Sequence, residues 1–141
     1  MCGAIYSGRG TLAKILMIED EANVRTLTEM YLKRLGYEVL LADNGWKGLD
    51  LYRREHPDVI VLDLIMPGMD GIEVLRQIRS VDLHQRVIVV TADSRPKTEW
   101  EVRALGVSEF LVKGSLVHSL GDTLKRLLKT PTNTRDPFQV I

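Results

Sequence analysis

Five residues with chemically useful side chains come at the ends of short apolar runs in this sequence: Glu19, Asp20, Asp63, Thr91 and Lys113. Consecutive aliphatic residues of this kind are typical of strands that are buried on both faces of a parallel sheet. In open parallel sheets the ligand site lies beyond the carboxyl ends of the strands. We therefore expect three carboxylates, a hydroxyl and an amine to meet at one edge of a sheet.

Three carboxylates at one edge repel one another unless a cation joins them. Two unit charges about 4 Å apart interact by about 4 kcal/mol at an effective dielectric constant near 20. Oxygen ligands without histidine or cysteine favour Mg²⁺, which also takes water and phosphate oxygens. With the ammonium of Lys113 and the hydroxyl of Thr91 added, the set predicts a pocket for a phosphoryl group. Asp63, which precedes Met66-Pro67-Gly68, is the candidate nucleophile for an acyl phosphate.

Five apolar runs alternate along the chain with five amphipathic stretches. This alternation predicts a parallel α/β sheet with right-handed crossovers. The predicted strands cover residues 15–18, 39–41, 59–62, 87–90 and 110–112. The predicted helices cover residues 22–35, 44–55, 71–81, 96 up to Gly106, and 116–128.

Local signals mark where these helices begin and end. Gly36 and Gly106 are expected to end the first and fourth helices, and Pro96 suits the first turn of the fourth. Asp43 and Ser115 are the expected N-caps of the second and fifth helices. The first helix is expected to bury an apolar stripe made of Val24, Leu27, Met30 or Tyr31, and Leu35.

The composition restricts the class of protein. A chain of 141 residues, 45% hydrophobic and 27% charged, predicts one soluble globular domain. Nineteen basic and nineteen acidic residues cancel, which argues against a direct nucleic-acid binder that relies on bulk positive charge. The single cysteine, Cys2, cannot form an internal disulfide, so we expect a reducing, cytoplasmic location. No signal peptide or membrane span is visible, and we expect no membrane association.

Four motifs in order along the chain resemble the receiver domain of two-component response regulators: IEDE at 18–21, VLDLIMPGMDG at 61–71, VTA at 90–92 and FLVK at 110–113. The resemblance implies a flavodoxin-like α/β fold, a single doubly wound five-stranded parallel sheet of order 2-1-3-4-5 flanked by five helices. We expect residues 13–130 to form this domain. Residues 1–12 are expected to be a flexible extension, and residues 131–141 a tail or truncated linker.

The resemblance also implies a role for each residue at the sheet edge. Asp63 would accept a phosphoryl group from a sensor histidine kinase or a histidine phosphotransfer protein. Asp20, Asp63 and the backbone carbonyl of Ile65 would bind Mg²⁺, and Glu19 would act on the ion through water. Lys113 would pair with the carboxylate of Asp63 and with the phosphate.

A second group of residues would respond to the phosphoryl group. Thr91 would turn inward to hydrogen-bond it, the N–H of Ala92 would approach it, and Phe110 would move inward with Thr91. The face formed by the fourth helix, fifth strand and fifth helix would then report the change. A downstream protein or a missing output domain would read that face, and dimerisation is compatible with it.

Two features depart from the family pattern or bear on its regulation. Gly114 stands where the family has a proline in a cis peptide. Because a cis bond without proline costs about 2.5–4 kcal/mol, we predict a trans Lys113–Gly114 bond and an altered loop into the fifth helix. Ile65 and Asp93 occupy positions that tune phosphate lifetime in the family.

Two other functions compete with a phosphoacceptor switch. A small phosphatase with an aspartyl nucleophile would have a second aspartate two residues after Asp63, where this chain has Ile65. A receiver-like module that only binds proteins would have lost an acid or the lysine, and all of them are present. We therefore expect a regulatory domain that assists only its own phosphorylation and dephosphorylation, and turns over no separate substrate.

Overall fold

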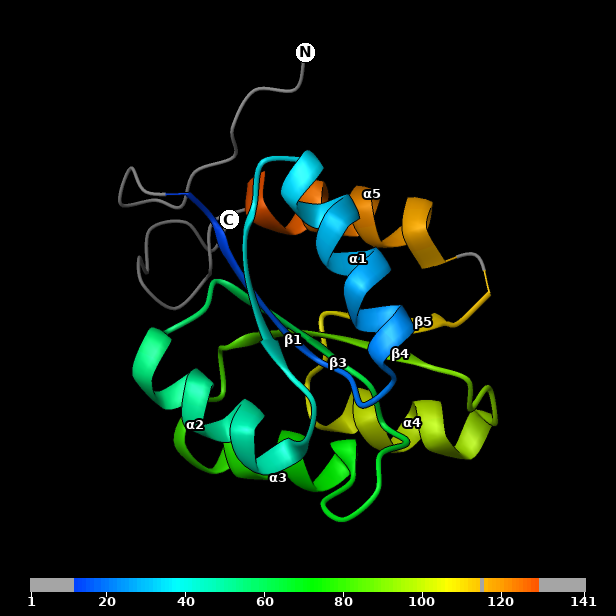
Figure 1. Ribbon diagram of the computed structural model, residues 1–141. Helices are drawn as coiled ribbons and strands as arrows, with labels where there is room; N and C mark the ends of the chain where they lie inside the picture. Colours follow the sequence, from blue (N-terminus) through cyan, green and yellow to red (C-terminus); the bar gives the residue numbers. More distant parts are fainter. Residues whose placement is uncertain (1–11, 115, 130–141) are drawn as a thin grey trace.

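The computed structural model describes residues 12–114 and 116–129, in which five strands and five helices alternate (Figure 1). The strands are β1 Lys14–Ile18, β2 Glu38–Ala42, β3 Val59–Leu62, β4 Arg86–Thr91 and β5 Glu109–Val112. The helices are α1 Ala22–Arg34, α2 Gly45–Glu55, α3 Gly71–Val81, α4 Pro96–Ala104 and α5 Leu116–Lys129. Every predicted element is present. Apart from Leu12, the predicted extension and tail lie outside the described residues, as does Ser115.

All neighbouring strands are parallel, and their order is β2-β1-β3-β4-β5, as predicted. Helices α1 and α5 cover one face of the sheet, and α2, α3 and α4 cover the other (Figure 1). Ile18 pairs in register with Leu62, so the chain leaves β1 and β3 at the same level. Thr91 pairs with Val112 at the ends of β4 and β5. The carboxyl ends of these four strands therefore form one edge.

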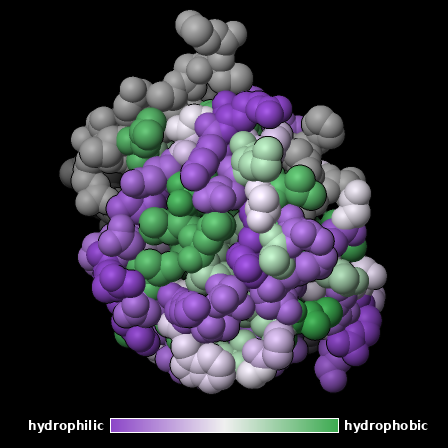
Figure 2. Space-filling model, in the orientation of Figure 1, coloured by the Kyte–Doolittle hydropathy of each residue, from purple (hydrophilic) through white to green (hydrophobic). Residues whose placement is uncertain are grey.

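The sheet separates two hydrophobic cores, and alternate residues of a strand enter different ones. In β1, Leu16 and Ile18 pack in the core under α2, α3 and α4, whereas Ile15 and Met17 pack in the core under α1 and α5. All four residues of β3 are buried, as expected for a central parallel strand. The edge strand β2 is half-buried, and Figure 2 shows apolar side chains gathered over it.

The predicted stripe of α1 is partly wrong. Leu27 and Met30 are exposed to 65% and 55%, whereas Thr28 and Leu32 are buried. The other predicted members pack against the core under α1 and α5: Val24, Tyr31 and Leu35. Leu27 and Thr28, three and four residues after Val24, both fit helical spacing, and the buried one is the polar threonine. Gly36 follows the helix with φ 99°, the left-handed conformation predicted for a residue that ends a helix.

The predicted N-cap of α2 is also wrong, by one residue. The side chain of Asn44 accepts a hydrogen bond of 2.9 Å from the backbone N–H of Lys47. Asp43 instead forms an ion pair with the ammonium of Lys47, at 3.2 Å. Asparagine and aspartate cap helices equally well, so their adjacent positions could not be ranked by residue type.

Candidate functional site

Three acidic side chains meet at the carboxyl edge of the sheet. Glu19 and Asp20 leave the end of β1, and Asp63 leaves the end of β3 beside it. One carboxylate oxygen from each lies within 4.8 Å of the other two. Glu19 and Asp63 are buried, whereas Asp20 is exposed. The two buried carboxylates cannot be screened by bulk water, so their mutual repulsion is substantial.

Lys113 brings a positive charge to this cluster from the end of β5. Its Nζ lies 2.7 Å from Oε1 of Glu19 and 3.2 Å from Oδ2 of Asp63. Burial alone lowers the pKa of Lys113, but the hydrogen bond to Glu19 and the charges of Asp63 and Glu19 outweigh that effect and raise the pKa. The lysine is therefore a stable cation at neutral pH, shared between two carboxylates.

The turn after β1 is held by a residue that the sequence did not single out. Nη1 of Arg25 donates hydrogen bonds to the backbone carbonyls of Glu19 and Asp20, at 2.9 and 2.7 Å. Oε2 of Glu19 also accepts one from the backbone N–H of Glu21, at 3.2 Å. Arg25 lies in the first turn of α1, where no sequence signal links it to the carbonyls of the preceding turn.

The turn after β3 depends on Gly71, the last residue of the motif at 61–71, to which the sequence analysis gave no role of its own. The backbone N–H of Gly71 donates to the carbonyl of Leu64, at 2.9 Å. A Cβ atom at position 71 would lie 2.2 Å from the backbone oxygen of Asp63. Oδ1 of Asp63 accepts a hydrogen bond of 3.1 Å from the N–H of Ile65. Gly71 thus lets α3 begin close enough to fix the turn that carries Asp63.

Thr91 lies at this edge at the end of β4, and Phe110 lies near it within β5. Thr91 is fully buried at the end of β4, and its Oγ1 accepts a hydrogen bond from the N–H of Asp93, at 3.1 Å. Phe110 is 8% exposed and packs in the core under α2, α3 and α4. Ala92 follows Thr91 as an exposed residue. The switch roles of these residues stay predictions.

The loop after β5 has the predicted trans peptide. No cis peptide bond occurs within residues 12–114 and 116–129, so the Lys113–Gly114 bond is trans. Gly114 adopts φ 132°, in the region that favours glycine. The backbone N–H of Lys113 donates to the carbonyl of Thr91, at 2.8 Å. This hydrogen bond anchors the backbone of Lys113 before the loop, so the orientation of its side chain does not require a proline at position 114.

The cluster has the donor set that a hard divalent cation requires. It offers three carboxylates and no histidine or cysteine, and Lys113 is the cation that contacts the carboxylates among the described residues. Three negative charges against one ammonium leave an excess of negative charge. Carboxylate oxygens in such an arrangement fit Mg²⁺.

None of the described helices is long and apolar enough to cross a membrane.

Comparison with known protein families relates the whole folded region to one of them. The sequence model of the family described as "Response regulator receiver domain" matches residues 15–125. Sporulation initiation phosphotransferase F of Bacillus subtilis is 33% identical over 120 residues, which cover 85% of this chain and 97% of that protein. The regulatory protein PhoP of the same organism is also 33% identical, over 82% of this chain but only 48% of its own length.

Solved structures give the same relationship. Chemotaxis protein CheY4 of Vibrio cholerae is 31% identical with a TM-score of 0.77, covering 82% of this chain and 98% of that one. The response regulator TrrA of Thermotoga maritima, solved with Mg²⁺ and beryllium fluoride, is 32% identical with a TM-score of 0.76. That match covers 83% of this chain and 100% of TrrA. Several relatives are longer proteins, of which this chain spans half or less.

Proposed function

This chain belongs to the response regulator receiver domain family, and on that premise we propose that Asp63 is the residue that accepts the phosphoryl group. The observation that carries the proposal is the position of its carboxylate. Asp63 is buried at the sheet edge, 3.2 Å from the ammonium of Lys113 and beside two further carboxylates. The donor is a phosphohistidine on a sensor histidine kinase or a histidine phosphotransfer protein.

In the transfer, an oxygen of the Asp63 carboxylate attacks phosphorus and the bond from phosphorus to the histidine nitrogen breaks. An acyl phosphate forms on Asp63, and the imidazole leaves and takes up a proton. Lys113 already contacts Asp63, and it is placed to neutralise the added phosphoryl oxygens. Glu19 holds the other side of the Lys113 ammonium and so orients it.

Mg²⁺ is the cofactor that these residues suit. We assign its ligands to Asp20, Asp63 and the backbone carbonyl of Ile65, with Glu19 acting through water. A bound divalent ion supplies charge neutralisation for the phosphoryl oxygens. Arg25 and Gly71 act indirectly, because they fix the two turns that present these ligands.

The output of the switch is a change in the face formed by α4, β5 and α5. Thr91 and Phe110 respond to the phosphoryl group, which the N–H of Ala92 also approaches. Trp100 on α4 is 82% exposed and Val112 on β5 is 43% exposed, so this face offers apolar surface to a partner. A downstream protein, an output domain or a second copy of the chain reads it. Residues 13–130 are the unit that performs this function, and the cytoplasmic location stays a prediction.

Intact mass spectrometry tests the proposal. The protein is incubated with phosphoramidate and Mg²⁺, and an adduct one phosphoryl group heavier is expected. The adduct is expected to be absent in Asp63→Asn and after removal of the metal with a chelator. Asp50→Asn, which changes an exposed aspartate on α2, is the matched control and is expected to be labelled normally. A wild-type protein that takes no phosphoryl group would instead be a binding-only module.

A further inference from the structure

The orientation of the Thr91 side chain depends on its neighbour Asp93. The backbone of Thr91 is held in the sheet, where its carbonyl accepts a hydrogen bond from the N–H of Lys113 at 2.8 Å. Its side chain can still rotate between staggered positions. Among the described residues, the one hydrogen-bond partner of Oγ1 is the backbone N–H of Asp93, at 3.1 Å. Rotation about the Cα–Cβ bond carries Oγ1 away from that N–H.

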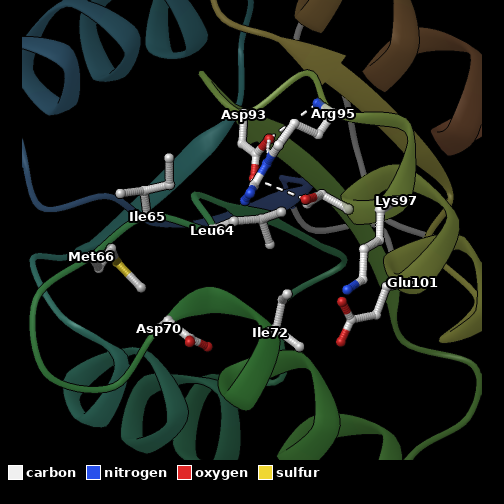
Figure 3. A pocket seen from close by; sticks show the side chains of 10 residues that line it. Leu64, Ile65, Met66, Asp70, Ile72, Asp93, Arg95, Lys97 and Glu101 are labelled. Atoms are coloured by element: carbon white, nitrogen blue, oxygen red, sulfur yellow. Dashed lines mark hydrogen bonds and ion pairs between the residues drawn. The ribbon is translucent and has the colours of Figure 1, made fainter.

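The carboxylate of Asp93 is in turn held by two side chains. Arg95 donates to it from Nε at 2.9 Å, from Nη2 at 2.7 Å and from its backbone N–H at 3.0 Å. Oγ1 of Thr98 donates to the second oxygen, at 2.9 Å. Figure 3 shows the Arg95 guanidinium folded back onto Asp93. The hydrogen bonds from Arg95, with that from Thr98, hold the pKa of Asp93 well below its usual range.

The same contacts define the first turn of α4. Arg95 is the N-cap residue of this helix, and Thr98 lies in its first turn. The other end of α4 is held separately, because Nε of Arg79 donates to the carbonyl of Leu105 at 2.6 Å. A change at Asp93 therefore acts on the start of α4 while its end stays anchored. A pocket of about 400 Å³, lined by Asp93 together with Leu64 and Ile65, leaves room for that change.

We propose that Arg95 and Thr98 are positioning residues that act through Asp93 to hold the Thr91 hydroxyl in its resting orientation. The Asp93 N–H and a phosphoryl group on Asp63 compete for Thr91. When Thr91 turns toward the phosphoryl group, the Asp93 turn loses a hydrogen bond and the start of α4 is released. This inference rests on the proposed function of Asp63, and it identifies the contacts that set the balance between the resting and switched states.

The resting half of the inference is tested without any phosphoryl group. Three-bond couplings to the Thr91 methyl carbon, measured by NMR on the unmodified protein, report the side-chain rotamer. Wild type is expected to show one rotamer, and Arg95→Gln and Thr98→Val are expected to show averaged couplings. Arg54→Gln is the matched control, because Arg54 contacts Asp50 on α2 through the same two nitrogens. Wild-type couplings in both test variants would overturn the inference.

The competition is tested with beryllium fluoride and Mg²⁺ as a stand-in for the phosphoryl group. Arg95→Gln removes an ion pair to Asp93, and Thr98→Val removes a hydrogen bond to it. Each variant is expected to lower the midpoint of the beryllium fluoride titration about three- to tenfold relative to wild type. Arg54→Gln is expected to leave it unchanged. If Arg95→Gln and Thr98→Val show averaged couplings but an unchanged midpoint, the Asp93 N–H and the phosphoryl group do not compete for Thr91. If wild type neither bound beryllium fluoride nor accepted phosphate, the proposed function would fail, whereas the rotamer result would still decide whether Arg95 and Thr98 hold Thr91.

Discussion

The half-buried Lys113 and the buried Glu19 form an ion pair, with Nζ of the lysine 2.7 Å from Oε1 of the glutamate. This contact is shorter than the 3.2 Å that separates the same ammonium from Asp63. Glu19 therefore has a role even without a metal ion, because it fixes the cation that faces Asp63, the proposed phosphoacceptor. The pair also explains how two buried carboxylates coexist in the unmodified protein.

Lys113→Met is expected to destabilise the metal-free protein. The substitution leaves Glu19 and Asp63 buried without their cation, and we expect the free energy of unfolding to fall by about 2 kcal/mol. Urea denaturation with and without Mg²⁺ measures the change, and Mg²⁺ is expected to restore part of it. Lys47→Met removes an exposed ion pair and is expected to stay within about 0.5 kcal/mol of wild type. Equal stability of Lys113→Met and wild type in chelator would contradict the charge account.

Mg²⁺ is expected to stabilise the folded state through Asp20. A ligand that binds only the folded state adds about 2.7 kcal/mol at a concentration of one hundred times its Kd. Thermal denaturation over a Mg²⁺ series is expected to show a rising Tm for wild type and Asp50→Asn. Asp20→Asn is expected to require at least about tenfold more Mg²⁺ for the same rise. The ligand assignment fails if Asp20→Asn and wild type respond to the ion alike.

Gly71→Ala is expected to destabilise the protein although alanine favours helices. The new Cβ would lie 2.2 Å from the backbone oxygen of Asp63, so the turn after β3 must shift. Overpacking of this kind costs about 1–3 kcal/mol, and contact with backbone favours the upper end. Ser80→Ala on the exposed side of α3 is the control. Phosphoryl labelling of Gly71→Ala is expected to slow as well, and a variant as stable and as fast as wild type would show that the turn is not rigid.

Tyr37→Phe is expected to stabilise the protein and to change its pH dependence. The Tyr37 hydroxyl is buried without a hydrogen-bond partner among the described residues, so removing it is expected to add about 1 kcal/mol. Burial, with a smaller effect of Tyr31, raises the pKa of Tyr37 to about 12. An unfolded tyrosine ionises near pH 10, so stability from the folded, neutral form is present below that pH and is lost as pH rises toward 12.

Denaturation curves at several pH values test whether stability falls as pH rises above 10. Between pH 10 and 12, wild type is expected to lose more stability than Tyr37→Phe. Tyr52→Phe is the matched control: Tyr52 is also buried, and burial raises its pKa as well, so this variant keeps the pH dependence that comes from Tyr37. Parallel wild-type and Tyr37→Phe curves over this range would contradict the assignment.

Much of this architecture follows from local sequence rules. Parallel strands end at one edge, so residues after the runs 15–18, 59–62 and 110–112 had to meet there, and Lys113 does reach Asp63. The face of α1 did not follow fully, because Leu27 fits the helical spacing from Val24 as well as the buried Thr28 does. Competing helical registers can be separated only by the packing partner.

The supporting contacts of the site were beyond sequence reasoning for a different reason. Arg25 reaches carbonyls of the preceding turn, and Arg95 folds back onto Asp93, through side-chain conformations that no spacing rule encodes. Gly71 is required by the close approach of α3 to the backbone of Asp63 and Leu64 in the turn after β3, which is a tertiary distance. Residue types therefore predicted which groups meet at the sheet edge, whereas the groups that support them could be found only from coordinates.

The most direct test of the central claim is to locate the acyl phosphate. Borohydride reduces an acyl phosphate of aspartate to homoserine, and peptide mass spectrometry of the labelled, reduced protein places the converted residue. The account predicts homoserine at position 63 after incubation with phosphoramidate and Mg²⁺, and none in unlabelled protein. Conversion at position 20, or labelled protein with no conversion at position 63, would contradict it.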